Sequence, residues 1–204
     1  PAPSVATPLT RPAHHPFVVP AHYAAALPDG YTKVHKGVAY DDQAFRRFFE
    51  RYGAEEWFRR TIFVFVADHV SSEKFAPQTR SYPGNMHIIG FMYTPDGALR
   101  SEVNEITQQL DLMPTLLGLL GNRERYFAFG RDLLNEPLRP QWSVSYDSEF
   151  RALTDSATLR LDDTTRAIAP LQADSAATAQ QQRFQALVQQ YYTRIERKNF
   201  TADD

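Results

Sequence analysis

Apolar residues recur along the chain in two spacings, one typical of helices and one of strands. Within residues 41–52 they fall at i, i+1, i+4, i+5 and i+8, a single stripe that predicts an amphipathic helix. The stripe consists of Ala44, Phe45, Phe48, Phe49 and Tyr52. Asp41 or Asp42 is the expected N-cap, because a carboxylate there accepts a hydrogen bond from an unpaired N–H of the first turn.

A continuous apolar run over residues 61–67 follows this helix and ends abruptly in Asp68 and His69. Its β-branched and aromatic residues predict a strand. Its lack of alternation predicts burial on both faces, as in a parallel sheet covered by helices. A second apolar run, residues 88–93, stops at a turn signature over residues 94–97. Strands and helices that alternate through the first two thirds of the chain predict an α/β fold.

Residues 111–120 are the next predicted helix, with Asp111 as its N-cap, Pro114 in its first turn and Gly121 just beyond its end. From residue 141 the pattern alternates, which predicts an antiparallel hairpin with a turn at residues 162–165. A linker of small residues, 173–179, leads into a last amphipathic helix. Its stripe is Phe184, Leu187, Val188, Tyr191, Tyr192 and Ile195.

Composition narrows the classes of function. The chain has 204 residues, 43% of them hydrophobic, which suffices for one core. Its 22 basic and 24 acidic residues leave no positive excess for binding nucleic acid. There is no cysteine, so thiolate metal sites and a cysteine nucleophile are excluded. The proline-rich start resembles no signal peptide, and we interpret the chain as a segment of a longer protein.

Asp68 and His69 are the first candidates for chemistry. In open α/β sheets, ligands bind at the carboxyl ends of strands. A carboxylate and an imidazole placed there are both metal ligands. The alternative is a plain strand end, at which Asp68 caps the next turn and His69 faces solvent.

Other histidines and acids carry weaker signals. His14 and His15, flanked by prolines, could bind an anion or a metal, and the alternative is an exposed pair without function. His87 is more simply a structural histidine, and a capping role explains Asp111 without metal binding. The chain contains neither a GxSxG nor an HExxH motif.

Six segments, taken together and in order, resemble the sulfatases and lipoteichoic acid synthases of the alkaline phosphatase superfamily. They are residues 14–17 (HHPF), 40–45 (YDDQAF), 61–69 (TIFVFVADH), 87–95 (HIIGFMYTP), 109–121 (QLDLMPTLLGLLG) and 129–134 (FGRDLL). The resemblance covers residues 13–134 and matches the carboxyl-terminal part of the family domain. It implies a partial alkaline-phosphatase-like sheet with flanking helices over residues 1–140. Residues 141–204 then form an antiparallel hairpin and helix of the same domain.

The resemblance implies roles for three residues. Asp68 and His69 would coordinate a divalent ion, manganese, magnesium, calcium or zinc, and His14 would contact the oxygens of the transferring phosphate or sulfate. His15 falls on a variable position of the family motif, so no role carries over to it. The family nucleophile and a further carboxylate ligand match no segment here. The chain is therefore expected to hold about half of a metal site and to be inactive by itself.

The resemblance also implies a parent enzyme. It would hydrolyse sulfate esters or transfer phosphoglycerol or phosphoethanolamine, with transfer favoured by the HHPF segment. It would act at the extracellular or periplasmic face of a bacterial membrane, with its anchor outside this chain. Expected partners are the ester substrate, the missing amino-terminal half of the domain and, through an unpaired sheet edge, a second copy.

Two other functions stay open. The chain could be a non-catalytic binding or scaffolding module derived from the same fold. It could also be a cytoplasmic relative of the phosphomutases with two metal ions, which requires further ligands near Asp68 and His69.

Overall fold

The computed structural model describes residues 4–100, 102–136, 141–161, 168–170, 177–198 and 200. The chain forms two compact units, residues 1–101 and 102–204. The predicted division at residue 140 stays a prediction. The expected turn at residues 162–165 and most of the linker at 173–179 lie outside the described residues. Over the ranges just given, none of the helices is long and apolar enough to span a membrane.

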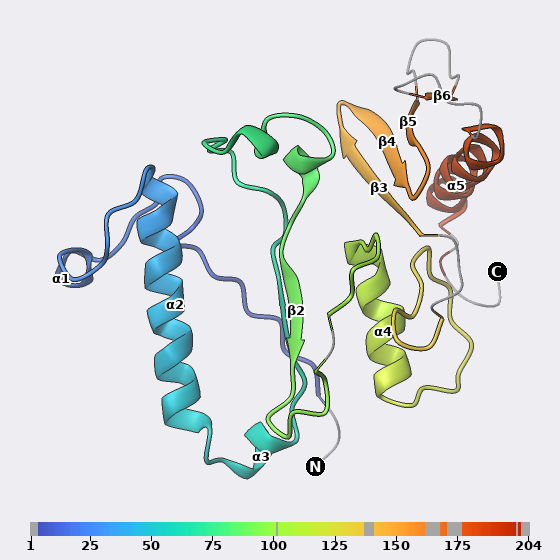
Figure 1. Cartoon of the computed structure of the whole chain (residues 1–204). Coiled ribbons are helices and arrows are strands. Elements are labelled where there is room, and N and C mark those ends of the chain that lie inside the picture. Colours follow the sequence, from blue (N-terminus) through green and yellow to red (C-terminus); the bar gives the residue numbers. More distant parts are fainter. Residues whose placement is uncertain are drawn as a thin grey trace. The chain divides into compact units, whose positions relative to one another are not determined.

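The first unit is built on one long helix and a two-stranded ribbon (Figure 1). Its elements are α1 (Ala21–Ala24), α2 (Lys33–Tyr52), α3 (Glu56–Arg59), β1 (Phe63–Val66), the 3-10 turns η1 (Pro77–Thr79) and η2 (Gly84–Met86), and β2 (Gly90–Tyr93). The strands pair antiparallel, with Phe63 opposite Tyr93 and Val66 opposite Gly90. The mixed helices and small sheets confirm the predicted α/β class.

The direction and burial of β1 correct the expectation of a parallel strand covered on both faces. Its described neighbour, β2, is antiparallel, and no residue of β1 is fully buried. Parallel neighbours need a crossover, usually a helix. The connection from β1 to β2 contains only two short 3-10 turns. The unbroken apolar run therefore indicates that both faces of the strand are apolar. It does not indicate that other elements cover both faces.

Helix α2 begins at Lys33 rather than at residue 41. Thr32 is its N-cap residue, and the Thr32 N–H donates to His35 Nδ1 at 3.3 Å. Asp41 and Asp42 thus lie inside the helix, and their predicted capping role is wrong. The pattern missed the first turns because Gly37 is a poor helix former and the residues around it carry few large apolar side chains.

The predicted aromatic stripe of α2 does face the ribbon. Phe45 meets Phe65 with ring centroids 5.2 Å apart, and Phe49 meets Phe63 at 5.5 Å. Phe48 also packs against Phe58 of α3, at 6.3 Å. Aromatic pairs at these separations stabilise a fold by more than the burial of their apolar area alone would.

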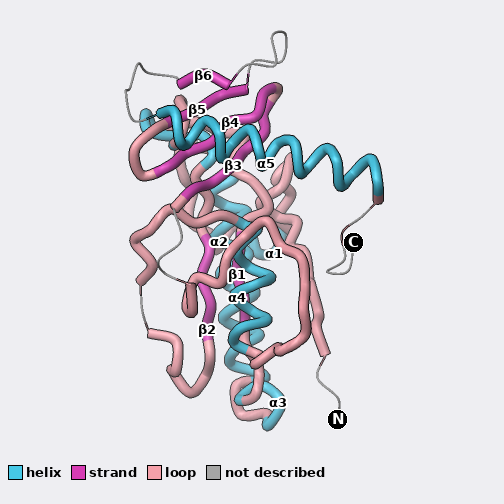
Figure 2. Tube along the Cα trace, turned by 90° about the vertical axis from the view of Figure 1, so that its right-hand side faces the viewer, coloured by secondary structure: helices cyan, strands magenta, loops and turns pink. Residues whose placement is uncertain are grey.

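The second unit contains a short helix and a four-stranded meander covered by a long helix. Its elements are η3 (Gln109–Asp111), α4 (Leu112–Leu119), β3 (Trp142–Asp147), β4 (Glu149–Thr154), β5 (Thr158–Leu161), β6 (Ile168–Pro170) and α5 (Ala177–Arg197). The strand order β3-β4-β5-β6 is antiparallel throughout, and α5 lies along one face of this sheet (Figure 2). The predicted hairpin and closing helix are confirmed.

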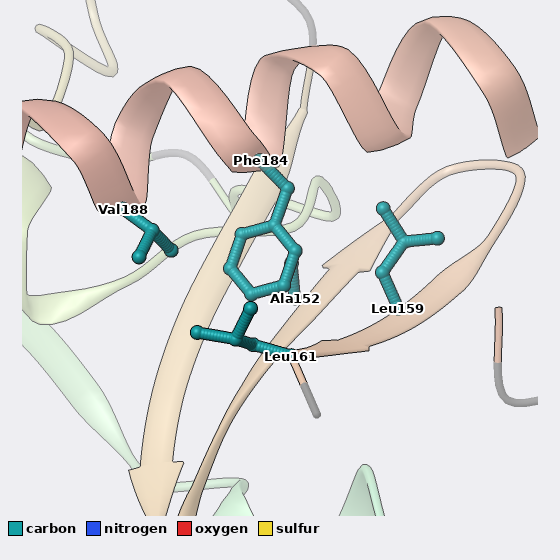
Figure 3. Close-up of a cluster of buried hydrophobic side chains, with 5 residues drawn as sticks. All are labelled: Ala152, Leu159, Leu161, Phe184 and Val188. Carbon is teal, nitrogen blue, oxygen red and sulfur yellow. The ribbon is translucent and has the colours of Figure 1, made fainter. Parts of the chain in front are cut away.

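The core of this unit lies between α5 and the sheet. Phe184 and Val188 point from α5 toward Ala152, Leu159 and Leu161 of the strands (Figure 3). Leu159 is completely inaccessible to solvent. Burying one such side chain contributes about 1.5–3 kcal/mol, so this cluster supplies much of what holds the unit together.

Helix α4 ends as its sequence predicts. Gly121 has φ +68°, the Gly121 N–H donates to Gly118 O at 3.0 Å, and the Asn122 N–H donates to Leu117 O at 2.9 Å. These two bonds form the Schellman motif, which needs a residue in the left-handed region, where glycine carries no steric cost.

Candidate functional site

Asp68 and His69 lie just beyond the carboxyl end of β1. Ala67 still belongs to the ribbon, because its N–H donates to Ile89 O at 3.1 Å. The next two side chains leave the ribbon and are open to solvent, 68% exposed for Asp68 and 69% for His69. An exposed carboxylate and imidazole at a strand end can take up a ligand without first leaving a packed core.

Local hydrogen bonds fix which atoms this pair presents. His69 Nδ1 lies 2.8 Å from Val70 O. A carbonyl only accepts, so Nδ1 carries the hydrogen and Nε2 presents a lone pair. Metal-ligating histidines are commonly oriented by such a bond at their other ring nitrogen. The His69 N–H in turn donates to Asp68 Oδ1 at 2.9 Å.

The donor atoms fit one divalent ion. His69 Nε2 and Asp68 Oδ2 are 3.6 Å apart. Two ligands at tetrahedral positions, each about 2.1 Å from zinc, lie about 3.4 Å from each other. The mixed nitrogen and oxygen set suits zinc or manganese better than calcium. Across the described part of the chain, no group of three or more His, Asp or Glu side chains could hold a metal ion, so neither His14 nor His87 completes the pair.

His14 lies in an exposed tight turn of the same unit. The Phe17 N–H donates to His14 O at 2.8 Å, and the His15–Pro16 peptide bond between them is cis. His14 Nδ1 lies 2.7 Å from His15 O and must be the donor, so Nε2 is the ring nitrogen that could contact a ligand. His14 and His69 are thus anchored in the same way, each through Nδ1 to the carbonyl of the following residue.

His87 follows η2 and is exposed to solvent. Its N–H donates to Gly84 O at 3.3 Å and closes that 3-10 turn. His15 is also exposed, and its ring meets the edge of Phe17 at 5.6 Å. Neither side chain joins the Asp68–His69 pair in a cluster that could hold a metal ion among the described residues.

Asp111, in the second unit, is a different kind of carboxylate. It is 1% exposed, its Oδ2 accepts from the Gln108 N–H and its Oδ1 from the Arg131 N–H, both at 2.9 Å. Burial raises the pKa of Asp111, while the two N–H groups and the Arg131 charge oppose that rise. Its side chain does not cap α4. The carboxylate instead closes η3 and holds residue 131, which leaves it no role as a metal ligand.

A buried polar network surrounds Asp111, and sequence reasoning missed it. Thr115 Oγ1 donates to Asp111 O at 2.6 Å and accepts from the Leu133 N–H at 3.0 Å. Arg131 Nη2 donates to Glu105 Oε2 at 2.8 Å. Polar residues inside the otherwise apolar segments 109–121 and 129–134 were the available signal, because buried polar groups need partners. The two segments are partners of each other.

Comparison with known proteins places these residues in a family. The family model described as Sulfatase matches residues 9–122, a range that contains His14, Asp68 and His69. Among solved structures, the chain matches a protein in the alkaline phosphatase superfamily from Vibrio parahaemolyticus, with a TM-score of 0.68 and 22% sequence identity. The match covers 93% of this chain and 48% of that one, so the chain spans about half the length of this relative. At this identity the match shows the fold. No curated protein matches the chain.

Proposed function

The chain belongs to the sulfatase family, and from that premise we propose that it is the carboxyl-terminal part of a domain that hydrolyses or transfers sulfate or phosphate esters with a divalent metal ion. One observation carries the proposal. Asp68 Oδ2 and His69 Nε2 lie 3.6 Å apart, solvent-exposed, with the imidazole oriented by Val70 O. This donor set and this spacing support the assignment of half a metal site to the pair.

The proposed roles follow from which ring nitrogen each histidine presents. Asp68 Oδ2 and His69 Nε2 hold the ion, and His69 does so as the neutral imidazole. A bound divalent ion supplies a Lewis acid that polarises the ester. His14 donates from Nε2 to a phosphate or sulfate oxygen and helps neutralise the charge that develops there. Because Nδ1 of His14 already donates to His15 O, this donation requires the doubly protonated ring.

The finer identity follows from the sequence resemblance. The HHPF segment favours the lipoteichoic acid synthase branch, and therefore transfer of phosphoglycerol or phosphoethanolamine over sulfate hydrolysis. The nucleophile and the remaining carboxylate ligand belong to a part of the domain outside this chain. The resemblance to this branch also supports the extracellular or periplasmic face of a bacterial membrane as the site of action, because members of the branch often carry outward-facing catalytic domains.

Metal binding tests the proposal directly. Calorimetric titrations with Mn²⁺ and Zn²⁺ would compare this chain, the Asp68→Ala/His69→Ala double variant and a chain extended upstream. Two protein ligands leave most coordination positions to water, so weak binding is expected here and tight binding in the extended chain. The double substitution should abolish both.

One control tests whether metal binding belongs to the Asp68–His69 pair. His87→Ala removes an exposed histidine that the proposal leaves out of the site, and its isotherm should match that of the unsubstituted chain. If neither chain binds metal and the double substitution changes nothing, the pair is structural. The non-catalytic binding module is then the better description.

A further inference from the structure

Helix α2 has a second packed face besides its aromatic stripe, and that face contacts the segment that carries His14. A Cβ at Gly37 would overlap the Pro12 carbonyl oxygen and lie 2.8 Å from the Pro12 carbonyl carbon. The helix and the segment are therefore in backbone contact there, and only glycine permits it. One turn later, Asp41 lies beside Thr10, whose hydroxyl lowers the pKa of the Asp41 carboxyl against the rise caused by burial.

The same helix also holds the chain on the far side of the His14 turn. Tyr23 of α1 packs on Tyr40 with ring centroids 5.2 Å apart. Arg47 donates from Nη1 to the Tyr23 hydroxyl at 2.7 Å and lies over its ring. The turn at residues 14–17 is thus bracketed by contacts with α2 before and after it.

The register between α2 and β1 places these contacts at the level of Asp68. Phe45 packs on Phe65 and Phe49 on Phe63, so helix and strand run in opposite directions. In Figure 1, β2 runs away from the end at which α2 begins, and its antiparallel partner β1 therefore runs toward that end. Asp68 lies about 10 Å beyond Phe65 along the strand direction. Asp41 and Gly37 lie about 6 and 12 Å beyond Phe45 along the helix.

The first turns of α2 also contact the loop that follows His69. The Val34 N–H points at Glu73 Oε2, 3.5 Å away, and the rings of His35 and Phe75 lie 4.8 Å apart. One stretch of helix, residues 34–41, therefore contacts the chain on both sides of the proposed site: the segment before His14 and the loop after His69.

We propose that Gly37 and Asp41 are positioning residues that hold the His14 turn against α2 at the level of the Asp68–His69 pair. Gly37 sets how closely the segment approaches the helix, and Asp41 fixes it along the helix through Thr10. Neither residue touches substrate. The inference rests on the proposed function, because a fixed His14 matters only if it acts together with that pair.

Bound Mn²⁺ supplies a measurement of position as well as of affinity. The ion is paramagnetic and broadens nearby proton resonances steeply with proximity, so Mn²⁺ held by Asp68 and His69 broadens the ring protons of each histidine according to distance. His14→Ala and His69→Ala assign the two rings. Broadening of His14 then measures how well its turn is held, and broadening of His69 reports the metal site itself.

Gly37→Ala and Asp41→Ala test the two contacts. Each should reduce the broadening of the His14 ring by about twofold or more, because a displaced and more mobile turn spends time farther from the ion. Broadening of His69 and calorimetric Mn²⁺ affinity should stay unchanged. Matched controls lie next along the helix: Val38→Ala and Asp42→Ala alter exposed neighbours. Asp41→Asn keeps an acceptor for Thr10 and should behave as the unsubstituted chain.

The outcomes separate the inference from the function on which it rests. If Mn²⁺ broadens His69 but Gly37→Ala and Asp41→Ala leave His14 as it is in the unsubstituted chain, the positioning role is wrong while the metal site stands. If Mn²⁺ broadens neither ring, in the unsubstituted chain or in the chain extended upstream, the proposed function fails and the positioning role fails with it. Loss of both signals in one variant, with changed circular dichroism, marks misfolding. Thr10→Val, which removes the hydroxyl that faces the Asp41 carboxylate, then replaces Asp41→Ala as the test of that contact.

Discussion

The two units of the chain each contain an aspartate from a segment that resembles the same family, and the two side chains have opposite surroundings. Asp68 is 68% exposed, and its carboxylate accepts from the N–H of the next residue. Asp111 is 1% exposed, and each of its oxygens accepts a backbone N–H from outside its own helix. One carboxylate is accessible to a ligand, and the other is committed to holding the backbone.

The difference shows what resemblance alone does not distinguish. A carboxylate whose oxygens already accept well-directed N–H groups in a dry site has little left to offer a cation. An exposed carboxylate beside an oriented imidazole can take up a ligand from solvent. Substitutions in the two places should therefore have different effects. Those in the second unit should change stability, and those at Asp68 and His69 should change metal binding.

Asp111→Ala should have the largest effect on stability. It leaves the Gln108 and Arg131 N–H groups buried without acceptors, which costs about 1–3 kcal/mol for each group. We expect a loss of about 3 kcal/mol in the free energy of unfolding of the second unit. Each unit contains one tryptophan, Trp57 or Trp142. Urea unfolding followed by fluorescence in a Trp57→Phe background therefore reports on the second unit. An unchanged urea midpoint would show that the Asp111 carboxylate does not stabilise the unit by accepting these two N–H groups.

Gly118→Ala should have the next largest effect. A Cβ there would overlap Asp132 Oδ2 and lie 2.9 Å from Asp132 Cγ. Asp132 cannot yield easily, because it accepts from the Leu134 and Asn135 N–H groups and from Asn135 Nδ2. Overpacking costs about 1–3 kcal/mol, more than the gain of about 1 kcal/mol from helix propensity.

A double-variant cycle with Asp132→Ala provides the control for Gly118→Ala. Once the carboxylate is gone, the added methyl group has room, and the cost of Gly118→Ala should shrink by about 1 kcal/mol or more. Additive effects of the two substitutions would show that the contact is not the cause.

Thr115→Val should cost somewhat less. Valine keeps the shape of threonine but removes the donor to Asp111 O and the acceptor of the Leu133 N–H. We expect a loss of about 1–2 kcal/mol, measured by the same urea unfolding of the second unit. Thr115→Ser keeps the hydroxyl and should recover most of that loss. A serine variant as unstable as the valine variant would assign the effect to packing.

Asp41 is half-buried, between exposed Asp68 and buried Asp111, and its effect on stability should depend on pH. Burial raises the pKa of Asp41 in the folded chain, partly offset by the Thr10 hydroxyl. The charged form of Asp41 therefore destabilises the folded chain. The free energy of unfolding is highest below the pKa that Asp41 has in the unfolded chain, and it falls as pH rises from there through the higher pKa in the folded chain. The free energy of unfolding of Asp41→Asn should therefore rise above that of the unsubstituted chain as pH increases from about 3.9, the usual value for an unfolded aspartate. The difference should stay below about 1 kcal/mol, because water still reaches the side chain. Unfolding in a Trp142→Phe background measures this, and a constant difference across the range would contradict it.

Sequence periodicity predicted those parts of the fold that local pattern determines. The aromatic stripe of α2, the Gly121 end of α4, the meander and α5 depend on spacing, on glycine and on alternation. It failed where non-local contacts decide. The start of α2 lies in a stretch whose glycine fits against Pro12, and the direction of β1 depends on how the chain returns through residues 67–89.

The candidate site divides in the same way. Asp68 and His69 are neighbours in sequence, so a motif finds both. The bond from His69 Nδ1 to Val70 O is also local, but its geometry appears only in the folded chain. The partners of Asp111 and Thr115 lie up to 20 positions away, at Arg131 and Leu133, and no periodicity connects them. The predicted cap of α4 needs only local contacts, whereas the Asp111 carboxylate accepts one local N–H, from Gln108, and one distant N–H, from Arg131.

The smallest expected effect belongs to the exposed pair. Asp68→Ala and His69→Ala should each change the free energy of unfolding of the first unit by no more than about 0.5 kcal/mol, as is usual for surface positions. Unfolding in the Trp142→Phe background measures this without metal. Added Mn²⁺ should then raise the midpoint of the unsubstituted chain and leave both variants where they were, because only an ion bound to the folded state stabilises it. Asp111→Ala should still respond to Mn²⁺, since its defect lies in the other unit. A large loss of stability on Asp68→Ala without metal would mean that this carboxylate, like Asp111, is committed to the backbone, and the contrast between the two units would disappear.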